Sequence, residues 1–147
     1  MKSTEPMDEL RALVDTVKVG FLSTLGIDGY PHTRWMTTTM LPGEHRFLYC
    51  VSMAGSRKVA DIQSDEKVTW SFQAASINKV VTINGSAVVL DNPQLKAEVL
   101  EVLGPNLSNF WRINPDPGHL IVIETAIEHV SLYLPAEGTV TQTEAQA

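Results

Sequence analysis

The stretch VSMAGSRKVADIQSDEKVTWSF, residues 51–72, changes its periodicity twice within a short length of chain. Its first residues end a run of β-forming side chains, and Ser56 is a residue type that commonly caps the N-terminus of a helix. Val59 and Ile62 then have the spacing of an apolar helix face, and KVTWSF alternates polar and apolar residues as a half-buried strand does. The stretch therefore predicts a helix over residues 56–64, inserted between two strands.

The first turn of this helix carries two cations, Arg57 and Lys58. Backbone N–H groups leave partial positive charge at a helix N-terminus, which disfavours each cation there by about 0.3–1 kcal/mol. Two interpretations follow from the residues. In the first, both side chains bend away into water. In the second, the N–H groups, the Ser56 hydroxyl and the two cations converge on one dianion such as a phosphate.

The sequence on either side of this stretch is rich in strand signals. Helices are predicted over residues 5–17 and from Asn92 to Val102, and strands over 19–25, 32–41, 46–52, 67–72, 80–90 and 119–134. Asp28-Gly29 is a hairpin turn signal, and Gly85 indicates a bulge or a bend within its strand. Short turns join most of the strands. We therefore expect a mainly β domain whose antiparallel sheet closes into a barrel with flanking helices.

Composition restricts the class of protein. A chain of 147 residues with 44% apolar residues, 19% charged residues and a net charge of −6 is expected to form one soluble globular domain, with no nucleic-acid partner and no membrane partner. Cys50 is the single cysteine, so no intramolecular disulfide can form, and a reducing cytoplasm is the expected location. The four histidines lack metal-ligand spacing, and no metal site is predicted.

Two segments in order carry a resemblance to a known family. They are GFLSTLGIDGYPHTRWM, residues 20–36, and the stretch 51–72 quoted above. From Val19 to Leu134 the chain resembles the FMN-binding split barrels related to pyridoxamine 5′-phosphate oxidase, within their general-stress-protein-like branch. The resemblance implies an antiparallel six-stranded split β-barrel of Greek-key type in one domain over residues 1–134. Residues 135–147 lack an apolar period, so we expect them to form a flexible tail.

The same resemblance implies a homodimer with an FMN site at the subunit interface. The implied phosphate ligands are Arg34, Ser52, Ser56, Arg57 and Lys58. Trp35, Met36 and Thr37 are implied to run along the isoalloxazine ring and ribityl chain, and Val51 is implied to pack beside Ser52 in the same site. In this interpretation the dianion at the start of the helix is the phosphate of FMN.

Departures from the oxidase restrict the expected reaction. Thr39 stands where the oxidase has a lysine for its substrate phosphate, Val80 stands where the family has a glutamine, and the chain lacks the arginine-rich C-terminal segment. We therefore do not expect vitamin B6 oxidation. The first hypothesis is an FMN-dependent oxidoreductase that acts on a small cytoplasmic molecule, with NADH or NADPH as a candidate reductant. The alternatives are a non-catalytic flavin-binding stress protein and a split barrel that binds haem or a deazaflavin.

Two further features have more than one interpretation. His32 is expected on the same strand face as Arg34, where it either lies at the surface or approaches a ligand. The segment Asn109–Arg112 contains two aromatic residues and a cation, which either pack against the barrel or cover a planar ligand of the partner subunit.

Overall fold

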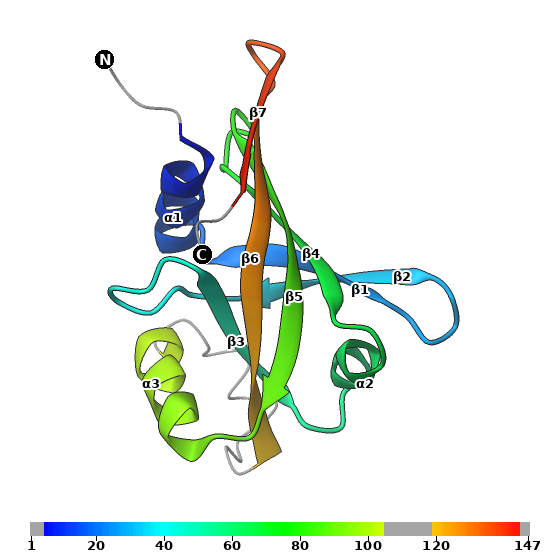
Figure 1. Cartoon of the computed structure of the whole chain (residues 1–147). Helices are drawn as coiled ribbons and strands as arrows, with labels where there is room; N and C mark the ends of the chain where they lie inside the picture. Colours follow the sequence, from blue (N-terminus) through cyan, green and yellow to red (C-terminus); the bar gives the residue numbers. More distant parts are fainter. Residues whose placement is uncertain (1–4, 105–118, 145–147) are drawn as a thin grey trace.

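The computed structural model describes residues 5–104 and 119–144, within which the chain forms three helices and seven strands (Figure 1). In chain order these are α1 (Pro6–Thr16), β1 (Val19–Leu25), β2 (Pro31–Thr37), β3 (Phe47–Met53), α2 (Arg57–Ser64), β4 (Lys67–Gln73), β5 (Val80–Leu90), α3 (Pro93–Leu103), β6 (Leu120–Leu134) and β7 (Thr139–Glu144). The helix predicted after Ser56 and the strands on either side of it are confirmed. None of the described helices is long and apolar enough to cross a membrane.

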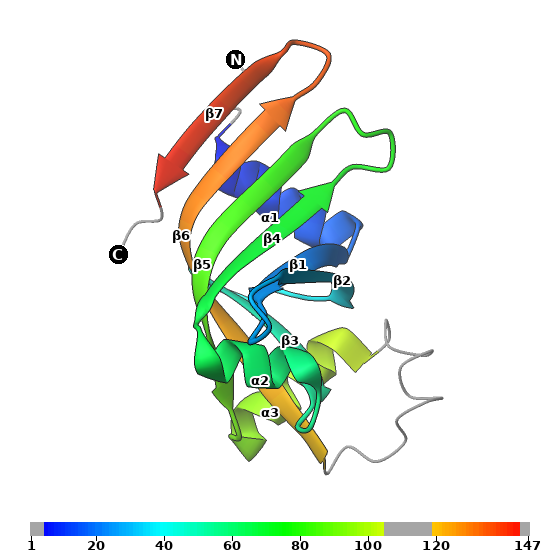
Figure 2. The ribbon, with the colours of Figure 1, turned by 90° about the vertical axis from the view of Figure 1, so that its right-hand side faces the viewer.

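The strands form one antiparallel sheet in the order β2-β1-β4-β5-β6-β3, with β7 paired to β6. Figure 2 shows β7, β6, β5, β4 and β1 side by side in that order. Beyond the end of β2, Thr39 exchanges backbone hydrogen bonds of 3.0 and 2.8 Å with Tyr49 of β3. This bridge joins the two ends of the strand order, so the sheet closes into a barrel. The mainly β antiparallel prediction is confirmed: the six strands β1 to β6 form the closed path, and β7 is a seventh strand that pairs with β6 off this path.

A bulge interrupts the long strand β5. The pairing register of β5 with β6 shifts between Asn84 and Gly85, which confirms the bulge predicted from the glycine. A side chain at this position would collide with the backbone carbonyl oxygen of Ala126 on β6. Only glycine therefore allows the two strands to approach this closely.

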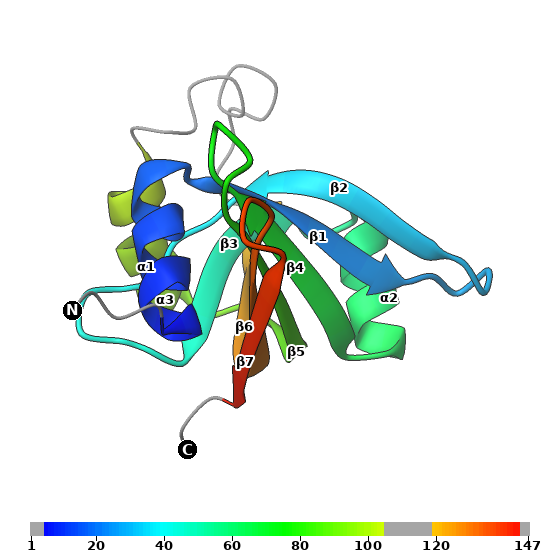
Figure 3. The ribbon, with the colours of Figure 1, turned by 90° about the horizontal axis from the view of Figure 1, so that it is seen from above.

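Two helices complete the core of the barrel. Leu10, Leu13 and Val14 of α1, together with Val59 and Ile62 of α2, belong to the same buried cluster as the side chains of the barrel interior. Figure 3 shows α1 and α3 on one side of the barrel and α2 on the opposite side. The apolar face of α2 therefore fixes the position of its N-terminus against the barrel wall.

The third helix packs against the outside of the barrel. Val99 and Leu103 of α3 form a second buried cluster with Tyr49 and Val51 of β3 and Val122 of β6. Strands β3 and β6 are thus apolar on both faces, because one face lines the barrel interior and the other lies beneath α3.

The C-terminal prediction is wrong for residues 139–144. The chain after residue 134 was expected to be flexible throughout because it lacks an apolar period, yet Thr139–Glu144 forms β7 and pairs antiparallel with residues 129–134 of β6. Most side chains of β7 are exposed, so backbone hydrogen bonding rather than side-chain burial places this strand.

We predict that a buried hydrogen bond between Trp70 and Thr125 stabilises the barrel interior. The indole Nε1 of Trp70 on β4 donates to Thr125 Oγ1 on β6 at 3.1 Å, and both side chains are buried. Thr125→Val keeps the volume but removes the acceptor, so the free energy of unfolding should fall by about 1–3 kcal/mol in urea denaturation. In a Trp70→Phe background the same substitution should cost little. An equal cost in both backgrounds would contradict this assignment.

Candidate functional site

The candidate site begins where β3 passes into α2. Ser56 has the extended backbone of an N-cap residue, but its side chain does not cap the helix. Its Oγ instead lies 2.9 Å from the Oγ of Ser52, near the end of β3. The N–H groups of the first helical turn therefore have no side-chain cap, and two serine hydroxyls lie beside them. This arrangement suits an anion at the helix N-terminus.

Lys58 is the cation nearest to these hydroxyls. Its Nζ donates to Ser52 Oγ at 3.0 Å, and no carboxylate of the described residues forms an ion pair with it. Burial lowers the pKa of the Lys58 ammonium, and the positive charge of Arg34 lowers it further. A half-buried ammonium whose hydrogen-bond partner among the described residues is a neutral hydroxyl has unbalanced charge, which an external anion would balance.

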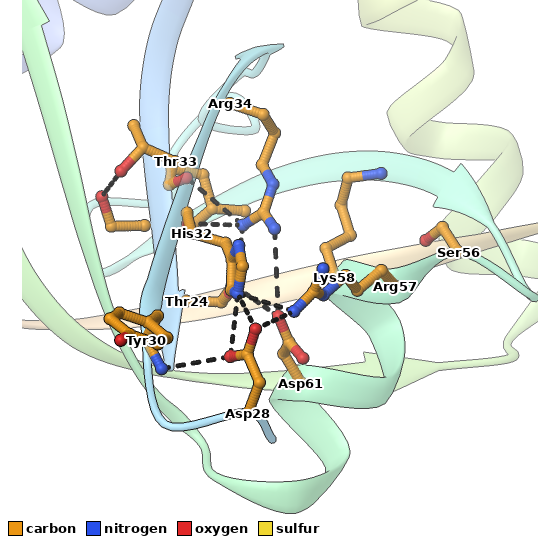
Figure 4. Close-up of polar contacts among 12 residues, drawn as sticks. Thr24, Asp28, Tyr30, His32, Thr33, Arg34, Ser56, Arg57, Lys58 and Asp61 are labelled. Atoms are coloured by element: carbon orange, nitrogen blue, oxygen red, sulfur yellow. Dashed lines mark hydrogen bonds and ion pairs between the residues drawn. The ribbon is translucent and has the colours of Figure 1, made fainter. Parts of the chain in front are cut away.

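Arg34 reaches the same region from β2 and is held by a partly buried network (Figure 4). Its Nη1 donates to Thr24 Oγ1 at 2.8 Å, to the His32 carbonyl oxygen at 3.0 Å and to the Leu22 carbonyl oxygen at 3.4 Å. Thr24 Oγ1 in turn donates to Asp61 Oδ2 at 2.9 Å. Among the described residues, the Nε and Nη2 atoms of Arg34 make no hydrogen bond, and Nη2 has only a long ion pair of 3.9 Å with Asp61, so this edge of the guanidinium can still donate to a ligand.

Asp61 supplies the counter-charge for Arg34. Its Oδ2 lies 3.9 Å from Arg34 Nη2, and the Asp61 side chain is 1% exposed. Burial lowers the pKa of Arg34, the negative charge of Asp61 raises it, and the charge of Arg57 lowers it. The network joins β1, β2 and α2, so it fixes the Arg34 side chain relative to the helix N-terminus.

Arg57 points toward the β1–β2 hairpin. Its Nη2 donates to Asp28 Oδ2 at 2.7 Å and lies 2.6 Å from His32 Nε2 (Figure 4). The hydrogen bond from His32 holds the pKa of Asp28 well below its usual range, and the Tyr30 N–H and Arg57 act in the same direction. The structure thus brings Arg57 close to the other cations but gives it a partner of its own.

The remaining predicted residues surround this cluster in different ways. Met36 packs against the barrel core, whereas Trp35 on the opposite face of β2 is 63% exposed. Thr37 ends β2, which pairs through its ladder with β1 alone. Val51 lies beneath α3, on the other face of β3 from Ser52, so only its backbone is close to the serine. The expectation for Asn109–Arg112 lies outside the described residues.

Sequence reasoning missed three residues of the site. Asp28 was interpreted only as a turn residue, while Thr24 and Asp61 were not singled out. The spacing of Asp61 could have indicated a place near the site, because Asp61 follows Lys58 by three residues and so lies on the same side of the helix as that cation. No local signal pairs Asp61 with Arg34, because the two lie on elements far apart in the sequence.

Comparison with known proteins agrees with the fold. The described architecture resembles a protein related to general stress protein 26 from Clostridium acetobutylicum, with a TM-score of 0.75 and 15% identity, covering 94% of this chain and 93% of that chain. General stress protein 26 from Bacillus anthracis gives a TM-score of 0.67 and 18% identity, and the match covers 93% of this chain and 98% of that chain. A haem-binding protein from Mycobacterium smegmatis gives a TM-score of 0.76 and 18% identity, and the match covers 98% of this chain and 60% of that chain.

A family model gives the assignment by sequence. No curated protein matches the chain. The model described as pyridoxamine 5′-phosphate oxidase matches residues 6–134, which include α1, the whole barrel and all the residues of the candidate site. The chain therefore belongs to the pyridoxamine 5′-phosphate oxidase family.

Proposed function

We propose that this protein binds FMN, with the flavin phosphate held by Arg34, Ser52, Ser56, Arg57 and Lys58. The observation that carries the proposal is the half-buried Lys58 ammonium, which donates to Ser52 Oγ at 3.0 Å and has no carboxylate partner among the described residues. A phosphate monoester carries a charge of about −1.5 to −2 at pH 7 and accepts several hydrogen bonds at once. It matches the ammonium, the two hydroxyls and the uncapped helix N-terminus better than a neutral ligand does.

The strand β2 provides a surface for the rest of the flavin. Because β2 pairs through its ladder with β1 alone, backbone groups on its other edge are free to address a ligand beside Arg34. Trp35, Met36 and Thr37 continue the strand directly after Arg34. We propose that their backbone N–H and C=O groups meet the polar edge of the isoalloxazine ring, while the Val51 backbone lies beside Ser52.

We further propose that the site is completed by a second copy of the chain. Trp35 is 63% exposed and Phe21, its cross-strand partner on β1, is 44% exposed. Two large exposed apolar side chains next to each other, one of them on the strand that carries Arg34 but on the opposite face of that strand, suit burial in a two-fold symmetric interface. The outer apolar faces of β3 and β6 are not part of the proposed interface, because α3 covers them.

The proposed activity is that of an FMN-dependent oxidoreductase acting on a small molecule, with NADH or NADPH as the candidate reductant. The flavin supplies the electron chemistry, and the residues of this chain bind and orient it. Thr39, at the position of the oxidase lysine, has a neutral side chain and therefore offers no cation to a substrate phosphate. It is 7% exposed, and its backbone closes the barrel with Tyr49. The proposed location is the cytoplasm, where the buried thiol of Cys50 stays reduced.

Haem is the alternative ligand favoured by a specific comparison, the haem-binding protein of the same fold. His32, the histidine closest to the cation cluster, contacts Asp28 and Arg57 through Nε2. An absorption spectrum of the purified protein distinguishes flavin, deazaflavin and haem. Reduction of the bound flavin by NADH or NADPH in stopped flow then separates an oxidoreductase from a protein that only holds flavin.

We predict that Lys58→Gln weakens FMN binding by at least tenfold, about 1.4 kcal/mol, and leaves riboflavin binding unchanged. Riboflavin lacks the phosphate, so a loss of affinity confined to FMN reports on the phosphate contact. The apoprotein should be at least as stable as the wild type, because the lowered pKa of Lys58 shows that the folded state disfavours its charge. Fluorescence titration and thermal melts measure both quantities. Equal wild-type affinities for FMN and riboflavin would refute the phosphate site.

We predict that the protein is a dimer at micromolar concentration and that Phe21→Asp shifts it toward the monomer. A buried carboxylate opposite Trp35 would lack a partner in the interface, which makes association unfavourable. Val140→Asp is the matched control, because Val140 on β7 is 59% exposed and lies outside the proposed interface. Light scattering gives the oligomeric state of each variant. A flavin-loaded wild-type monomer would contradict the proposal.

A further inference from the structure

The ion pair between Arg57 and Asp28 differs from the other charge contacts of the site. Arg57 is the first residue of α2, and Asp28 lies in the tight turn between β1 and β2. The Arg57 side chain is 56% exposed and that of Asp28 is 46% exposed, whereas Asp61 beside Arg34 is 1% exposed. An exposed ion pair gains little net free energy because water solvates both charges well, so it opens easily.

Asp28 is also shared between two donors. His32 Nε2 lies 3.0 Å from Asp28 Oδ1 and 2.6 Å from Arg57 Nη2. This nitrogen donates to Asp28 when it carries a proton and accepts from Arg57 when it does not, so it cannot serve both partners at once. When Nε2 carries the proton and donates to Asp28, its contact with the Arg57 guanidinium is unfavourable, which lowers the cost of moving Arg57 away from Asp28.

The charge of Arg57 acts on the rest of the cluster. The positive charge of Arg57 disfavours the charged form of Arg34, and Arg34 does the same to Lys58. The three cations thus lie within electrostatic reach of one another at the start of α2. A dianion among them would attract Arg57 in competition with the single negative charge of Asp28.

We propose that Asp28 is a specificity-determining residue: it is an internal counter-ion for Arg57, and the phosphate of the ligand replaces it when the ligand binds. The inference rests on the proposed phosphate site. It adds that the ion pair between Arg57 and Asp28 opposes binding of the phosphate. Asp28 lowers the affinity for a phosphorylated flavin and leaves the affinity for an unphosphorylated flavin unaffected. It therefore reduces the discrimination between the two ligands and keeps the bound cofactor exchangeable.

Asp28→Asn tests this role with little disturbance of the turn. Asp28 Oδ1 accepts from the Tyr30 N–H at 3.1 Å, and an asparagine side-chain oxygen can accept the same bond. Gly29 has a φ of 89°, and an Asn-Gly pair is favoured in a hairpin turn of this kind. Asp28→Ser, which also retains an acceptor for Tyr30, serves as a second variant.

The experiment is a fluorescence titration of the apoprotein with FMN and with riboflavin. Asp28→Asn should tighten FMN binding by about two- to fivefold, the range expected from loss of an exposed ion pair, and should not change riboflavin binding. In an Arg57→Gln background the same substitution should have no effect on FMN affinity. Asp15→Asn is the matched control, because it removes the same formal charge from an exposed position on α1. It should leave both affinities unchanged.

Three outcomes would overturn the inference. FMN affinity that is unchanged or lower in Asp28→Asn would mean that Asp28 does not compete with the phosphate. An increase in FMN affinity that persists in the Arg57→Gln background, or that appears equally in Asp15→Asn, would mean that the effect comes from net charge rather than from Arg57. A wild-type protein that binds FMN no better than riboflavin would overturn the proposed phosphate site as well. A wild type that prefers FMN, combined with failure of Asp28→Asn alone, would overturn only the role of Asp28.

Discussion

Repulsion among three cations is the constraint on which the arrangement of the candidate site depends. Arg34, Arg57 and Lys58 converge where β2 meets the N-terminus of α2, a place where the helix itself adds partial positive charge. The structure deals with each cation differently. Arg34 has a buried carboxylate, Arg57 has an exposed one, and Lys58 has a hydroxyl. The three side chains therefore differ in how readily each can turn to a ligand.

The fixed member of this set also connects the fold to the site. The Arg34 guanidinium, the Thr24 hydroxyl and the Asp61 carboxylate come from β2, β1 and α2. Each is hydrogen-bonded or ion-paired within the network, so its buried polar atoms retain partners after leaving water. Packing of Val59 and Ile62 against the core holds α2 in the position that this network requires. Apolar burial and polar contacts thus agree on one placement of the helix.

The sequence predicts those features that depend on local chemistry. The N-cap at Ser56, the hairpin turn at Asp28-Gly29 and the bulge at Gly85 each follow from residues within a few positions. Contacts between distant elements were not predictable in this way. Asp61 meets Arg34 only after α2 has docked on the barrel, and Thr39 closes the sheet only after β3 has come alongside. The proximity of Arg34 to Arg57 and Lys58 was expected from a family resemblance rather than from spacing.

The strand β7 covers an edge of the sheet that could otherwise pair with another chain. One edge of β6 is shared, because residues 120–126 pair with β3 and residues 129–134 pair with β7. Without β7, the second half of β6 would expose unpaired backbone groups beside the apolar residues Val130 and Leu132, a suitable template for another strand. The sequence TVTQTE replaces that edge with a short, polar one. The C-terminal segment therefore protects the barrel against edge-to-edge aggregation.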